Sequence, residues 1–163
     1  MALRAGVGGG VRGGLPAYVV GEPVTIETKM DTLDIRFQPI AQNWFEMVTA
    51  YALPQRFPGH KARVIETRRT LARQDEVATI GASQLRVGYH NFGLALDFAI
   101  FGEEGLYLKD GNHPAYLCAG QIAEALGCVW GGRWKMKDSG HIEYHPDGVT
   151  LDSLRLAAGL TTA

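Results

Sequence analysis

The chain has 163 residues, of which 46% are hydrophobic and 20% are charged, and its formal net charge is −1. This length suits one domain with a real hydrophobic core, and the composition is that of an ordinary globular protein. The near-neutral charge gives no electrostatic reason to expect nucleic acid or an anionic membrane as a partner. No apolar run reaches the length of a transmembrane helix or of a signal-peptide core. We therefore predict that the protein is made in the cytoplasm without a signal peptide and does not insert into a membrane.

The start of the chain is rich in glycine and poor in large apolar side chains. We therefore predict a flexible leader over residues 1–16 and a single domain over residues 17–163. Residues 8–13 match the GxGxxG pattern of dinucleotide-binding loops. No strand can precede the pattern so near the start of the chain, so we attribute the match to composition.

The first half of the domain is predicted to contain two strands and two helices. β-Branched residues with partial alternation predict a strand over residues 18–28. Residues 38–53 are predicted to form a helix that buries a stripe at helical spacing: Ile40, Trp44, Met47, Val48 and Tyr51. A short strand is predicted over residues 63–66. Thr70 is placed to cap a second helix that runs through Val77 towards Gly81.

The second half is predicted to contain the longest strand. Side chains over residues 94–101 alternate between a face with Leu94, Leu96, Phe98 and Ile100 and a face with Ala95, Asp97, Ala99 and Phe101. A helix is predicted over residues 114–126, and short strands over 129–130 and 141–144. Because no regular βαβ alternation appears, the predicted fold class is α+β, with a small, mainly antiparallel central sheet flanked by helices.

The two cysteines and three of the histidines are not expected to bind a metal ion. Cys118 and Cys128 are the only cysteines, and we interpret both as buried free thiols rather than as a disulfide or metal ligands. His60 and His113 lie in polar contexts and are predicted to be surface residues. His145 directly precedes a proline, so we place it at the rim of any site.

Asp97 is the first candidate for a functional residue. On its predicted face it lies between Ala95 and Ala99, which leaves room for a metal ion and a substrate. A buried structural aspartate is the alternative interpretation. His90 precedes Asp97 by too many positions for one flat strand, but Gly93 allows the backbone to turn between them and bring the imidazole back to the carboxylate.

A second polar group surrounds the last predicted strand. His141 and Glu143 share one face of it, and a turn before the strand places Asp138 near the same point. Two imidazoles and one carboxylate can bind zinc at the sheet and leave a coordination position open for water. A neighbouring carboxylate such as Asp138 can then act as a base. Glu143 is open to two interpretations, orienting a ligand or pairing with a cation.

Together these segments resemble the zinc D-alanyl-D-alanine carboxypeptidase and L-alanyl-D-glutamate endopeptidase family, which includes phage endolysins. The family pattern is S-x-H-x-x-G-x-A-x-D, followed near the C-terminus by D/E-x-x-H. The chain matches it at His90, Gly93, Ala95, Asp97, Asp138 and His141. Residues 69–74 are similar to the family segment R-T-x-x-x-Q, and residues 130–134 to W-G-G-D-W. The resemblance covers residues 67–144.

The resemblance implies a zinc-dependent peptidase that cleaves the stem peptide of bacterial peptidoglycan. His90, Asp97 and His141 would bind Zn2+, and Asp138 would be the general base and then the general acid. Arg69 would bind a substrate carboxylate or stabilise the oxyanion, with a structural arginine as the alternative. We expect a monomer that acts on the cell wall after release from the cell, as an endolysin does in host cell lysis.

Two departures from the family pattern bear on substrate preference. Gly88 stands where the family has serine, and Arg133 replaces the acidic residue of W-G-G-D-W. Neither is a proposed zinc ligand. Trp130 and Trp134 could wall the cleft, although core packing is the simpler expectation.

Three alternatives stay open at this point. Two histidines and a carboxylate also form the iron site of non-haem oxygenases, although those sites usually present H-x-D/E on one strand. A binding module can keep the zinc and lose catalysis, as in the signalling domain of hedgehog proteins. Within the peptidase interpretation, we favour the L-alanyl-D-glutamate endopeptidase over the D-alanyl-D-alanine carboxypeptidase.

Overall fold

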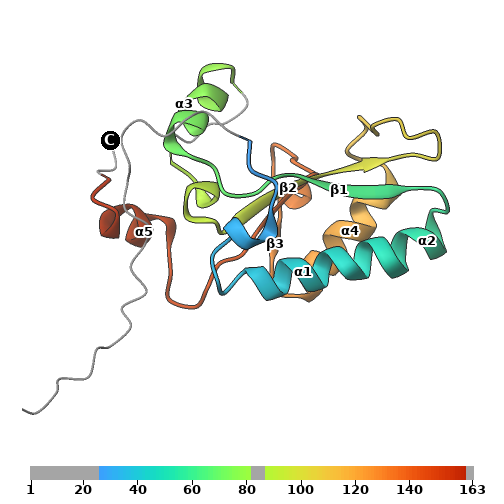
Figure 1. Ribbon diagram of the computed structural model, residues 1–163, viewed down its shortest axis with the longest axis horizontal. Helices are drawn as coiled ribbons and strands as arrows, with labels where there is room; N and C mark the ends of the chain where they lie inside the picture. The colour runs from blue at the N-terminus through green and yellow to red at the C-terminus, as the bar shows by residue number, and fades with distance from the viewer. Residues whose placement is uncertain (1–25, 82–86, 161–163) are drawn as a thin grey trace, which may run out of the picture.

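The computed structural model describes residues 26–81 and 87–160 of the chain (Figure 1). The predicted leader over residues 1–16 lies outside the described residues. The predicted strand over 18–28 lies outside them up to residue 25, and its last three residues form no strand. None of the described helices combines the length and apolarity needed to cross a membrane.

A four-stranded antiparallel sheet with the order β1-β2-β4-β3 forms the centre of the fold. The strands are β1 (Lys61–Glu66), β2 (Ala95–Phe101), β3 (Val129–Trp130) and β4 (His141–Glu143). The strands predicted over residues 63–66, 94–101, 129–130 and 141–144 are therefore confirmed, with small shifts at their ends. The α+β class with a small antiparallel sheet is confirmed as well.

Helices make up most of the remaining elements. They are α1 (Gln38–Glu46), a π-helical segment η2 (Met47–Ala52), α2 (Leu53–Arg56), α3 (Leu71–Thr79), α4 (Pro114–Ala125) and α5 (Leu151–Ala157). Short 3-10 helices occur at η1 (Met30–Thr32), η3 (Tyr89–Phe92) and η4 (Gly131–Arg133). As predicted, Thr70 caps α3, and its hydroxyl accepts a hydrogen bond from the Arg73 N–H at 3.1 Å. Helix α5 was not predicted.

The core lies between one face of the sheet and helices α1 and α4. Phe98 of β2 packs against Trp44 of α1 and Tyr116 of α4, with ring centroids 4.8 and 5.7 Å apart. The Trp44 indole N–H donates to the carbonyl of Ala119, which joins α1 to α4. Figure 1 shows these helices along the same side of the sheet. The opposite face of β2 is thereby left to carry the polar residues.

The long helix contains a widened turn that the sequence pattern did not predict. The Leu53 N–H bonds to the carbonyl of Val48, five residues earlier, directly before Pro54, which has no N–H to donate. This turn moves the next buried position from Tyr51 to Leu53. The predicted stripe is thus wrong at Met47 and Tyr51, which are 38% and 57% exposed.

The predicted burial is confirmed for the two cysteines and is wrong for two histidines. Cys118 and Cys128 are buried free thiols, as expected. His60 and His113 are not simple surface residues, because both are half-buried and their rings stack 5.4 Å apart beside Phe57. His113 also caps α4 by accepting the Ala115 N–H.

Candidate metal centre

Strand pairing places three polar residues in one row across the sheet. Asp97 on β2 lies directly opposite His141 on β4, and Glu66 on β1 lies opposite Asp97 on the other side. A β-bulge between Val64 and Glu66 creates this row, because regular pairing would have placed Ile65 opposite Asp97. Side chains directly opposite each other in antiparallel strands point to the same face and lie close enough to interact.

His90 reaches this row from the short helix η3. Gly93 ends the helix with a φ of 68°, and a Cβ at this position would lie 2.7 Å from the Asp34 backbone nitrogen. Only glycine suits such a turn, as the sequence indicated. The Nδ1–H of His90 donates to the Thr67 carbonyl at 2.6 Å, which leaves Nε2 as the nitrogen with a free lone pair.

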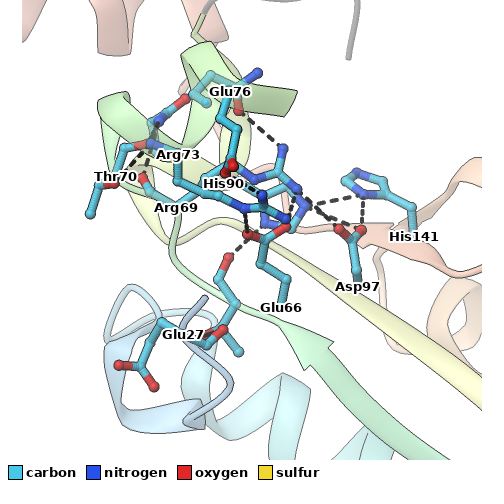
Figure 2. A network of polar contacts seen from close by, with 12 residues as sticks. Glu27, Glu66, Arg69, Thr70, Arg73, Glu76, His90, Asp97 and His141 are labelled. Carbon is cyan, nitrogen blue, oxygen red and sulfur yellow. Dashed lines mark hydrogen bonds and ion pairs between the residues drawn. The ribbon is translucent and has the colours of Figure 1, made fainter. Parts of the chain in front are cut away.

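Three possible ligand atoms converge at the centre of the row (Figure 2). The Nε2 atom of His90 lies 3.2 Å from Oδ1 of Asp97 and 3.3 Å from Nδ1 of His141. The remaining pair, Nδ1 of His141 and Oδ1 of Asp97, is 2.7 Å apart. A tetrahedral zinc ion with bonds of about 2.0–2.1 Å separates its ligands by about 3.3 Å, so these positions fit a metal with little movement.

Glu143 holds His141 in the orientation that a ligand requires. Its Oε1 accepts the Nε2–H of His141 at 3.0 Å, so Nδ1 is left to face Asp97. Its other oxygen bonds Nε2 of His145 at 2.7 Å, and the His145 ring stacks on Tyr89. Glu143 therefore contacts both histidines, and the exposed His145 lies at the rim as predicted. Such outer partners fix the tautomer of metal-binding histidines.

The charges at the centre oppose the effect of burial. Burial alone would raise the pKa of Asp97, but the imidazoles of His90 and His141 outweigh it and hold that pKa well below its ordinary value. Burial alone would lower the pKa of His141, but hydrogen bonds to Asp97 and Glu143 raise it to about 10. In the metal-free protein, the protonated imidazole of His141 therefore supplies the positive charge beside the Asp97 carboxylate.

Arg69 lies behind the predicted ligands and binds the second oxygen of Asp97. Its guanidinium bonds Oδ2 of Asp97 at 3.1 Å, the Glu66 carboxylate and Oε1 of Gln74 (Figure 2). The side chain of Arg69 is only 10% exposed. Glu66 also pairs with Arg73 on α3. Sequence reasoning missed Glu66, whose one signal was a carboxylate at the end of a predicted strand, three residues before Arg69.

Asp138 lies beside the three converging atoms and not among them. It occupies the turn before β4, where its N–H donates to the Gly131 carbonyl and its own carbonyl accepts the His141 N–H. Gly131 permits this approach, since a Cβ there would lie 2.5 Å from the Asp138 carbonyl oxygen. Partial burial raises the pKa of Asp138, and the charge of Asp97 raises it further against the opposing effect of His141.

An open groove of about 420 Å³ begins at this centre. Asp97 and Asp138 both line it, so the carboxylates of the centre face a space that a substrate can enter. Its walls come from β1, β2, the loop over residues 107–112, helix α4 and the turn before β4: Ile65, Phe98, Tyr107, Leu108, Lys109, Gly111, Asn112, Tyr116, Lys137, Ser139 and Gly140.

The two tryptophans near the centre have different roles. Trp130 is buried, packs on Gly120 and donates its indole N–H to the Ser139 carbonyl, as expected for a core residue. Trp134 is partly exposed, and its ring lies 5.1 Å from that of His141, so it forms a wall of the site. Arg133 turns away and pairs with Glu124 of α4 through two hydrogen bonds. Its charge is therefore largely neutralised.

These features define a class of protein: an α+β domain with an open centre of two histidines and one aspartate on its sheet. Comparison with known proteins gives a similarity to one family. Residues 82–144 match a family model described as D-alanyl-D-alanine carboxypeptidase. Over these residues the chain is similar to that peptidase family, which confirms the predicted resemblance.

Among characterised proteins, the chain is similar to the peptidoglycan L-alanyl-D-glutamate endopeptidase CwlK of Bacillus subtilis (strain 168). The two are 42% identical over 67 residues, which is 36% of this chain and 40% of CwlK. The chain thus matches about two fifths of that relative's length.

Solved structures give a second comparison. The L-Ala D-Glu endopeptidase ChiX of Serratia marcescens is 23% identical, with a TM-score of 0.55 over 71% of this chain and 83% of ChiX. The two chains therefore share a fold. A variant of the vancomycin resistance D,D-pentapeptidase VanY, solved in complex with Zn(II), is 19% identical, with a TM-score of 0.45 over 88% of this chain and 90% of VanY.

Proposed function

We propose that this chain is a zinc-dependent peptidase that hydrolyses the stem peptides of bacterial peptidoglycan. The observation that carries the proposal is the convergence of Nε2 of His90, Oδ1 of Asp97 and Nδ1 of His141, with Asp138 beside them in an open groove. The match to the family model and the activity for which CwlK is named support the same substrate.

The donor set suits zinc, because two neutral imidazoles and one carboxylate are a common ligand set for catalytic zinc. Zinc bound there would supply a Lewis acid that polarises the scissile carbonyl and lowers the pKa of water. Asp138 would accept the proton of the attacking water and return it to the departing amine. Its raised pKa suits both transfers. Arg69 adds positive charge behind Asp97, where its guanidinium is bound to Asp97 and Glu66.

We favour cleavage between L-alanine and D-glutamate, because the characterised relative that is 42% identical carries that activity in its name. Removal of a terminal D-alanine is the second candidate, since the matching family model is described by that activity. The test is digestion of purified peptidoglycan by the zinc-loaded protein, followed by mass spectrometry of the new termini. New D-glutamyl amines support the endopeptidase, and free D-alanine alone supports the carboxypeptidase.

The same experiment tests the broader proposal. The matched control is His141→Ala, which should lose both metal and cleavage. Bound zinc without cleavage of any wall chemotype would favour a binding module instead. Stoichiometric iron in protein purified without added metal, together with oxygen consumption, would replace the peptidase with an oxygenase.

Two further proposals concern where the enzyme acts and its oligomeric state. Because peptidoglycan lies outside the cell membrane, we propose that the enzyme acts on the wall after release, in the manner of an endolysin. Expression in a bacterial host should then cause lysis only when the membrane is permeabilised. We also propose a monomer, since the predicted ligands and the base come from one chain; light scattering should then give about 17.7 kDa.

A further inference from the structure

Two lysines line the groove next to the candidate metal centre. Lys137 directly precedes Asp138 in the turn before β4, and Lys109 lies on the facing loop over residues 107–112. The two walls touch each other: Nζ of Lys137 donates to Oδ1 of Asn112 at 3.0 Å. A Cβ at Gly111 would lie 2.9 Å from Oγ of Ser139. The two walls of the groove are therefore held in direct contact with each other.

The two lysines contribute positive charge to a groove that Asp97 and Asp138 also line. Within residues 26–81 and 87–160, neither Lys109 nor Lys137 forms an ion pair. In contrast, three arginines near the centre are paired, with Arg69 and Arg73 bound to Glu66 and Arg133 bound to Glu124. Two cations that face an open groove can attract an anionic group of a ligand.

The place of Lys137 indicates which part of a substrate this anionic group belongs to. In the proposed reaction Asp138 protonates the nitrogen of the departing amine, so that nitrogen lies beside Asp138. A carboxylate carried by the same residue is only a few bonds from its nitrogen. Lys137 directly precedes Asp138 and both residues line the same groove, so a carboxylate bound near Asp138 lies close to the lysine.

We propose that Lys137 and Lys109 form a carboxylate subsite that recognises a free carboxylate on the residue that supplies the leaving amine. The inference rests on the proposed function and adds the residues that determine specificity. A glutamyl residue within a peptide has such a group, because one of its two carboxyls forms the onward bond and the other stays free. A C-terminal residue offers the same chemistry through its terminal carboxylate.

The test uses four synthetic alanyl-D-glutamyl peptides. They carry either a carboxylate or its amide at the glutamyl residue and, independently, at the C-terminus. Cleavage by the zinc-loaded protein gives kcat/KM for each peptide. Binding of the corresponding glutamyl product peptides, which cannot be cleaved, is measured by calorimetry. The binding measurement is independent of turnover, so failure of the subsite and failure of the proposed function give different results.

We expect the free carboxylate to be preferred over its amide by about tenfold or more, as for a hydrogen bond between charged groups. Lys137→Met and Lys109→Met should each reduce this preference by about threefold to tenfold, and added salt should weaken it in the wild type. Lys135→Met is the matched control, because this exposed lysine is two residues from Lys137 and does not line the groove. It should keep the full preference.

The outcome is decided by the ratio of kcat/KM between each carboxylate peptide and its amide counterpart. A folding defect or a change at Asp138 lowers both values alike and leaves this ratio unchanged. Equal binding of carboxylate and amide peptides by the wild type would overturn the subsite, whether or not the peptides are cleaved. A preference that survives in both lysine variants would overturn it too. A preference that follows the glutamyl carboxylate identifies an internal residue as the ligand, and one that follows the C-terminal carboxylate identifies a chain end. Selective binding without cleavage would retain the subsite and refute the peptidase.

Discussion

Each imidazole of the centre is oriented by the hydrogen bond on its far nitrogen. His90 donates from Nδ1 to the Thr67 carbonyl, and His141 donates from Nε2 to Glu143. The two histidines therefore face Asp97 with different nitrogens, Nε2 and Nδ1. Mutagenesis cannot remove the Thr67 backbone carbonyl, but it can remove the Glu143 carboxylate. The effect of orienting His141 on metal binding can therefore be tested directly.

Glu143→Ala should lower the affinity for zinc by about tenfold to a hundredfold, because His141 loses the acceptor that fixes its tautomer. Competition with a chromophoric chelator measures the affinity. Glu124→Ala is the matched control, since this carboxylate pairs with Arg133 on the protein surface. Unchanged zinc affinity in Glu143→Ala would show that the carboxylate does not support the ligand.

Asp138→Asn should keep the metal and lose activity by at least about a hundredfold, because an amide cannot take the proton of the attacking water. Metal content and kcat/KM on one defined peptide are measured on the same preparation. Turnover at the wild-type level would remove Asp138 from the mechanism.

Zinc affinity should also depend on pH through His141. Hydrogen bonds to Asp97 and Glu143 raise its pKa to about 10 against the effect of burial, so the imidazole of the metal-free protein is protonated at neutral pH. The proton must leave before Nδ1 can bind a cation, and rising pH therefore favours the metal. Between about pH 6 and pH 8 the affinity should increase about tenfold per unit. An affinity that stays constant over this range would contradict the prediction.

At the scale of elements, the sequence predicted what depends on local pattern. The alternation around Asp97 predicted its strand and its face, and Gly93 predicted the turn that returns His90. Glu66 was missed, because its place opposite Asp97 depends on a bulge in the pairing of β1 with β2. Strand partners are set by contacts distant in sequence, which a local pattern does not contain.

The long helix shows a second limit of local pattern. A period of 3.6 residues predicted Tyr51 in the core, but the π turn before Pro54 buries Leu53 instead. The proline was visible in the sequence, and the helix predicted over residues 38–53 ended directly before it. Widening by one residue keeps the helix continuous while avoiding the missing donor, and only the packed structure reveals this solution.

Helix α4 and the turn that carries Asp138 are joined through one tight contact. A Cβ at Gly120 would lie 2.1 Å from the ring of Trp130, whose indole N–H holds the Ser139 carbonyl. Gly120→Ala should therefore destabilise the protein by about 1–3 kcal/mol, even though alanine is the better helix former. Urea unfolding measures the change, with Gln121→Ala on the exposed side of the same helix as control. A Gly120→Ala protein that is more stable than the wild type would show that the Trp130 ring can move to accommodate a Cβ.

At the scale of the whole molecule, the metal should act as a clamp. Its predicted ligands come from η3, β2 and β4, so a bound ion links segments that are 51 residues apart in sequence. Zinc at about a hundred times its dissociation constant should add about 2.7 kcal/mol to the free energy of unfolding. Calorimetry should then show Tm higher by about 5–10 °C than in chelator. His141→Ala should show no such difference, and the proposal of a zinc site would be refuted if the wild type showed none either.

The direct pairing of Asp97 with His141 has a consequence for how the chain reaches its native state. If β4 were to dock one position out of step, Ile142 would face the polar side of the sheet and the imidazole would be driven into the apolar interior. The proposed zinc site would then lack one of its three ligands. Zinc binding should therefore require the native register of β4, and binding would report that the sheet has paired correctly.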